Sequence, residues 1–122
     1  MTARNLLFLY GAALAATYAA LQAGNYVFAT SPHFLVYSPA HFLGGVSVGI
    51  FVRYVCSVAG MRLRLLYFVI AILVIGTAWE LWEYGLGLTE YPADSIDALS
   101  DYMMDILGAV LAYRFLRYHP HI

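Results

Sequence analysis

The chain has 122 residues, of which 63% are hydrophobic and only 11% are charged, whereas charged residues make up about 25% of an ordinary soluble domain. A soluble domain of this length has too little interior to hide so many apolar side chains, so we expect an integral membrane protein. The absence of Lys excludes a Schiff-base lysine, and the single Cys56 excludes an internal disulfide or a thiolate metal cluster. The few scattered Arg residues form no basic patch, so no nucleic-acid partner is expected.

Four apolar segments follow one another along the chain, each of about the length that crosses 30 Å of hydrocarbon. They cover residues 6–30, 41–59, 65–86 and 95–116. Gly and Pro residues separate them, as in Ser31-Pro32, Gly60 and Pro92. We therefore predict an all-α fold: a single domain over residues 1–122 that forms a compact bundle of four transmembrane helices. The alternative for the first segment is a cleaved signal peptide, but its apolar stretch is longer than the usual h-region.

The arginines predict the orientation in the membrane. Counting from the first segment, the six Arg residues all fall on one side of a four-span protein: Arg4, Arg53, Arg62, Arg64, Arg114 and Arg117. The connectors at 31–40 and 87–94 contain none. Since positive residues mark the cytoplasmic side, we expect both termini in the cytoplasm and a multi-pass protein of the cytoplasmic membrane.

The acidic residues gather at the opposite side. The last segment opens with Asp94, Asp97, Asp101 and Asp105, whose spacings of three, four and four place them on one helical stripe. Glu80 and Glu83 share a face near the end of the third segment. His41 opens the second segment beside Gly44 and Gly45, and the first contributes Gln22 and Asn25. These polar groups are expected to converge in the outer half of the bundle.

Several of these residues also have ordinary structural explanations. Asp94 and Asp97 suit helix capping, whereas Asp101 and Asp105 lie too deep to cap. Glu80 and Glu83 suit an aromatic membrane interface, and Gln22 and Asn25 suit hydrogen bonding between helices. For Arg53, the alternatives are snorkelling to the interface and pairing with Asp105.

The stretches His41-Phe42-Leu43-Gly44-Gly45, Trp79-Glu80-Leu81-Trp82-Glu83 and Asp101-x-x-x-Asp105-x-x-Gly108-Ala109 resemble the VanZ-like group of small bacterial membrane proteins, which includes the teicoplanin-resistance protein. The resemblance covers the last three segments. This chain departs from the group's pattern in its second Glu, in Asp105 where Asn is commoner, and in lacking an Arg before the last motif. The resemblance implies a helical bundle in the bacterial inner membrane and a role in the cell envelope, but no particular reaction.

The sequence leaves three functions open. The first is a divalent-cation pocket that binds or acts on a lipid-linked phosphate, with Glu80 or Asp101 as general base. Its expected ligands are His41, Glu80, Glu83, Asp97, Asp101 and Asp105. Carboxylates favour Mg²⁺, Ca²⁺ or Mn²⁺, and an added imidazole favours Mn²⁺ or Zn²⁺. The second is an ion- or proton-coupled transporter, and the third is an accessory subunit whose acids pair with another membrane protein or a second copy.

Overall fold

The computed structural model describes the backbone of residues 2–28, 38–62, 64–87 and 95–118; within these ranges, the side chains of 25–28, 83 and 95–98 are not described. Helices are the only regular secondary structure among the described residues, which confirms the all-α prediction. Its four helices are α1 (Ala3–Phe28), α2 (Ser38–Val58), α3 (Leu65–Gly85) and α4 (Ser95–Tyr118). Their bounds lie within three residues of those predicted from the apolar segments.

Local chemistry explains where the helices begin and end. The Thr2 hydroxyl accepts a hydrogen bond from the Asn5 backbone N–H at 3.2 Å and caps α1. Helix α2 begins at Ser38 with Pro39 in its first turn, a position where the missing N–H costs nothing. Gly60 ends α2 with a φ of 66°, and the Met61 N–H donates back to the Cys56 carbonyl at 2.8 Å. This left-handed C-cap favours glycine.

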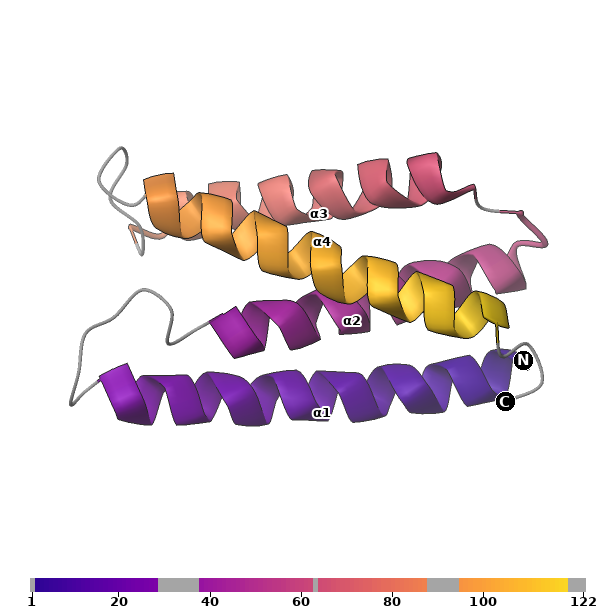
Figure 1. Cartoon of the computed structure of the whole chain (residues 1–122), viewed down its shortest axis with the longest axis horizontal. Helices are drawn as coiled ribbons and strands as arrows, with labels where there is room; N and C mark the ends of the chain where they lie inside the picture. The colour runs from indigo at the N-terminus through magenta and orange to yellow at the C-terminus, as the bar shows by residue number, and fades with distance from the viewer. Residues whose placement is uncertain (1, 29–37, 63, 88–94, 119–122) are drawn as a thin grey trace.

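The helices run antiparallel in chain order but are not packed in that order. Helix α2 packs extensively against both α1 and α4, whereas α3 packs mainly against α4 and only slightly against α2 (Figure 1). One end of the bundle holds the start of α1, the α2–α3 connection and the end of α4. We call it the arginine end. We call the other end, where α3 ends and α4 begins, the acidic end.

Two apolar clusters form the interior. The first joins Leu6 and Ala13 of α1 to Ile50 of α2 and to Ala112 and Leu116 of α4. The second joins Phe68 and Ile72 of α3 to Ala109 of α4. Each cluster includes α4, so this helix connects both parts of the bundle.

Within the described residues, three helical segments are long and apolar enough to cross a membrane: Ala3–Gly24, Ser38–Val58 and Leu65–Trp82. Much of their apolar surface is exposed, for example Phe8 at 75% and Leu66 at 66%. This outward-facing apolar surface is what a lipid solvent requires. Helix α4 has 24 residues, enough to cross a bilayer by length, but it carries Asp97, Asp101 and Asp105.

Candidate functional site

His41 lies between two carboxylates of α4. Its Nε2 is 3.3 Å from an Asp101 carboxylate oxygen, and its Nδ1 is 3.7 Å from an Asp105 carboxylate oxygen. The three side chains are 21%, 13% and 24% exposed, so water reaches them only in part. A protonated imidazole donates from both nitrogens and in that form can serve both carboxylates. We call His41, Asp101 and Asp105 the triad.

Small residues bring α2 and α4 close enough for the triad to form. His41, Gly45 and Gly49 recur at intervals of four along one face of α2. A Cβ built on Gly45 would overlap the Asp105 backbone, lying 2.7 Å from its Cα, and one built on Gly49 would lie 3.1 Å from the Ala109 Cα. Real Cβ atoms essentially never approach below 3.0 Å, so Gly45 is required for this contact.

Glycines of two helices lie next to the Asp105 carboxylate. One of its oxygens lies 3.8 Å from where a Gly44 Cβ would be, and the other lies 4.0 Å from a Cβ on Gly76, both ordinary van der Waals distances. Gly44 belongs to α2 and Gly76 to α3. The carboxylate therefore lies where three helices meet.

Glu80 is the most buried acid among the described side chains of the acidic end, at 8% exposure. It lies one helical turn beyond Gly76 on α3, in the direction of the acidic end. A Cβ built on Gly76 would lie 3.2 Å from the Tyr102 ring of α4. Because α3 and α4 run antiparallel, one turn further along α3 corresponds to one turn earlier on α4. This register places Glu80 level with residue 98 of α4, about 4.5 Å nearer the acidic end than Asp101.

Hydroxyl pairs hold the neighbouring helices around the triad. The Tyr102 hydroxyl donates to the Thr77 hydroxyl at 3.2 Å and links α4 to α3. The Thr17 hydroxyl donates to the Ala13 carbonyl at 2.9 Å and lies 3.2 Å from the Ser47 hydroxyl, which links α1 to α2. Such bonds stabilise helix contacts where no water competes.

Other predicted residues have different outcomes. The side chains of Glu83 and Asp97 lie outside the described part of the chain, as do Asn25 and the whole of Asp94. Gln22 is exposed on α1. The sharper alternative for Arg53, pairing with Asp105, is wrong: Asp105 pairs with His41, and the α2 residue against Asp105 is Gly45, about 12 Å along the helix from Arg53.

The described residues contain no group of three or more His, Cys, Asp or Glu arranged to hold a metal ion as they stand. The physical reason is visible in the triad, whose two carboxylates lie against opposite nitrogens of the ring. Both carboxylates therefore already have the imidazole as a neighbour. The predicted metal ligation stays a prediction, since two of its expected ligands lie outside the described side chains.

Sequence reasoning missed several residues around the triad. Ser38 is 8% exposed, and its hydroxyl has no hydrogen-bond partner among the residues that the structure describes. A Ser before a Pro is typical of a helix start, which is the signal that could have found it. Gly49 continues the small-residue face of α2 beyond Gly45. The interval of four from Gly45 to Gly49 was the available signal.

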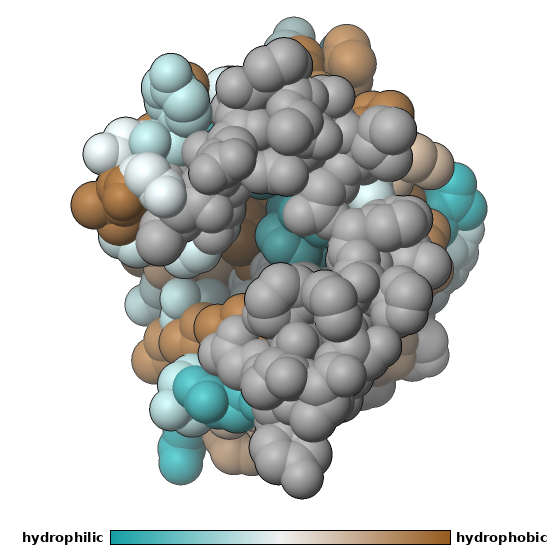
Figure 2. Space-filling model, turned by 90° about the vertical axis from the view of Figure 1, so that its left-hand side faces the viewer, coloured by the Kyte–Doolittle hydropathy of each residue, from teal (hydrophilic) through white to brown (hydrophobic). Residues whose placement is uncertain are grey.

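The surface at the acidic end is consistent with this arrangement. Figure 2 looks at the molecule from that end and shows a hydrophilic surface near the centre of the view.

Comparison of the chain with protein-family models, curated proteins and solved structures gave no match. The resemblance to the VanZ-like group therefore stays a prediction.

Proposed function

We propose that the chain is an integral membrane protein that crosses the bilayer four times and binds a divalent cation from its acidic end. Three helices have the length and composition to cross a membrane. The fourth, α4, turns Asp101 and Asp105 towards α2, so these carboxylates need not face lipid. All six Arg residues belong to the opposite end, which we assign to the cytoplasm.

The observation that carries the cation site is the position of His41 between Asp101 and Asp105. An imidazolium in this position is an internal cation held by two carboxylates. Glu80, the most buried described acid of the acidic end, adds a third carboxylate from α3. Carboxylates clustered in a bilayer repel one another, so the site favours a cation from outside. This ion would share the two Asp carboxylates with His41 or take its place between them.

The packing between the triad and the arginine end favours a pocket that is open at one end only, and it argues against a path through the molecule. Towards the arginine end, Gly45 and Gly49 contact the α4 backbone directly, and Phe68 is fully buried against this interface. Among the residues that the structure describes, every acidic residue lies level with Asp105 or nearer the acidic end. A transporter built from one chain would need polar groups on the other side as well.

Binding of Mn²⁺ to the purified protein in nonionic detergent tests the proposal. The electron paramagnetic resonance signal of free Mn²⁺ should fall as wild-type protein is added. Asp101→Asn and Glu80→Gln should each abolish the fall, while helix content stays unchanged by circular dichroism. Asp94→Asn is the matched control, because it removes the same charge at a position that Asn also caps well, and it should keep binding.

Protons should compete with Mn²⁺ for the same oxygens, so binding should weaken as the pH is lowered. A wild-type protein that takes up no Mn²⁺ at pH 8 would overturn the proposal. So would equal losses in Asp94→Asn and Asp101→Asn, because the ion would then bind at the surface. In either case the triad would serve only to hold α2 against α4.

A further inference from the structure

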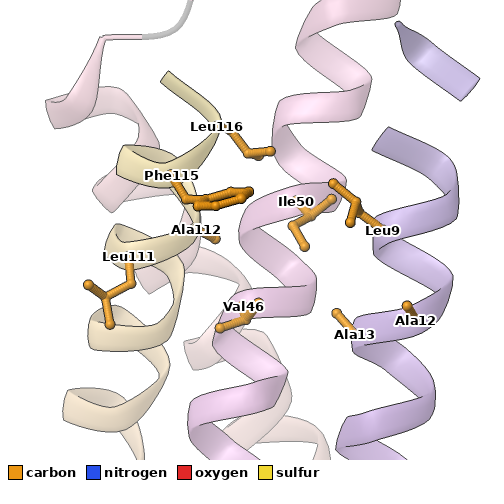
Figure 3. Close-up of a pocket in the computed structure, with 9 residues that line it drawn as sticks. All are labelled: Leu9, Ala12, Ala13, Val46, Ile50, Leu111, Ala112, Phe115 and Leu116. Atoms are coloured by element: carbon orange, nitrogen blue, oxygen red, sulfur yellow. The ribbon is translucent and has the colours of Figure 1, made fainter. Parts of the chain in front are cut away.

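A second feature lies near the opposite end of the bundle. A groove of about 390 Å³ runs between α1 and α4, with α2 as its floor (Figure 3). All nine lining residues are apolar, and none comes from α3. The small side chains of Ala12, Ala13 and Ala112 leave the space open, with Val46 and Ile50 between the two walls. The volume falls within the roughly 300–1,000 Å³ of small-molecule sites.

Arg53 marks the arginine end of this groove. It follows Val46 and Ile50 at intervals of seven and three residues, which places all three on one face of α2. Arg53 is partly buried and makes no ion pair or hydrogen bond with any residue that the structure describes. Arg4 and Arg114 add exposed positive charge at the same end of the two walls. A half-buried guanidinium near the end of a membrane helix either snorkels to the interface or pairs with an anion, and the apolar groove beside Arg53 favours an anion carried on a hydrocarbon chain.

We propose that the groove holds an acyl chain of an anionic phospholipid whose phosphate pairs with Arg53. An apolar groove facing lipid fits a hydrocarbon chain, and a guanidinium fits a phosphate with two parallel hydrogen bonds. Basic pockets between membrane helices bind acidic headgroups by the same chemistry. This site is separate from the triad, at the other end of α2.

Charge argues against a second copy of the chain as the occupant. Two copies inserted in the same orientation would place their arginine ends side by side. The groove of one copy would then meet the arginines of the other, while the acidic residues of the described helices would lie towards the far end. An anionic phospholipid would instead place its negatively charged phosphate at the level of Arg53.

Native mass spectrometry of the full chain, exchanged into mixed detergent–lipid micelles, tests the proposal. The probes are dioleoylphosphatidylglycerol, which is anionic, and dioleoylphosphatidylcholine, which has the same chains and no net charge. The wild type should retain the anionic lipid preferentially. Arg53→Gln should weaken its retention about five-fold, the effect of one Arg near an anionic headgroup. Ala12→Phe, at an exposed groove position, should displace both lipids by filling the space.

Arg117→Gln is the matched control, since Arg117 lies two residues from Phe115 and therefore on the other face of α4. It should leave the preference unchanged, and Arg53→Gln should leave Mn²⁺ binding at the triad unchanged. Equal retention of the two lipids by the wild type would overturn the proposal, as would an Arg117→Gln effect as large as that of Arg53→Gln. A dimer of the chain that Ala12→Phe dissociates would also overturn it and assign the groove to a second copy.

Discussion

Gly45 lies directly against the backbone of Asp105, with no room for a side chain between the two helices. The first prediction follows from this contact. Gly45→Ala should lower the free energy of unfolding by about 1–3 kcal/mol, because the added methyl group forces α2 away from α4. Thermal unfolding in detergent measures the change. Gly44→Ala is the control, since its Cβ would meet only ordinary van der Waals contacts at 3.8 Å. Equal melting temperatures for the two variants would contradict the packing described.

The second prediction concerns the internal cation. His41→Ala should lower the free energy of unfolding by about 1–3 kcal/mol, because Asp101 and Asp105 then face each other without the imidazole. Millimolar Mn²⁺ should restore much of this loss by occupying the vacated position, through the stabilisation that any ligand of the native state provides. The double variant His41→Ala/Asp101→Asn should show no such rescue. If Mn²⁺ stabilises both variants equally, the ion binds elsewhere.

The third prediction concerns the hydrogen bond from Tyr102 to Thr77. Tyr102→Phe should cost about 0.6 kcal/mol, the average for a hydrogen bond between membrane helices. A double-mutant cycle with Thr77→Val isolates the pair, because the second substitution should cost little once the first is made. A coupling energy near zero would mean that the two hydroxyls do not bond in the folded protein.

The fourth prediction is the topology. Reporter fusions after Gly60 and Ile122 should read cytoplasmic, and fusions after Pro39 and Pro92 should read extracytoplasmic. These assignments are derived from the distribution of the arginines and from the order of the four helices along the chain. A cytoplasmic reading at Pro92 would place the triad's open end in the cytoplasm and remove the outer cation pocket.

The helices were predictable because apolar length and Gly or Pro breakers are local signals. The largest differences are at α1 and α2, which each begin three residues before the predicted start. Helix α2 begins at Ser38 and not at His41. Its first turn is polar and contains Pro39, so apolar patterning places the start one turn late, while the capping preference of Ser and Pro identifies it.

The neighbours of each helix were not predictable from the pattern of apolar residues. Four membrane helices of similar length can pack in several orders, since lipid and a partner helix are equally apolar. The order observed depends on where small residues allow close approach, as at Gly45 and Gly49. The sequence predicted that His41, Asp101 and Asp105 would meet, which the structure confirms. Whether both imidazole nitrogens face carboxylates depends on the side-chain rotamers, which the spacing of residues in the sequence does not determine.

The position of α3 has a consequence for how the protein is made. Helix α3 packs chiefly on α4, which follows it in the chain, so during synthesis α3 enters the bilayer before its main partner exists. It is the most apolar of the three spanning segments and is stable in lipid alone. Helix α4, with its aspartates, arrives last, when α2 already presents His41 and its glycine face. An isolated segment of residues 95–118 should therefore fail to insert in a glycosylation assay, whereas the complete chain inserts it. The helix that lipid tolerates least is thus synthesised when its polar partners are already in place.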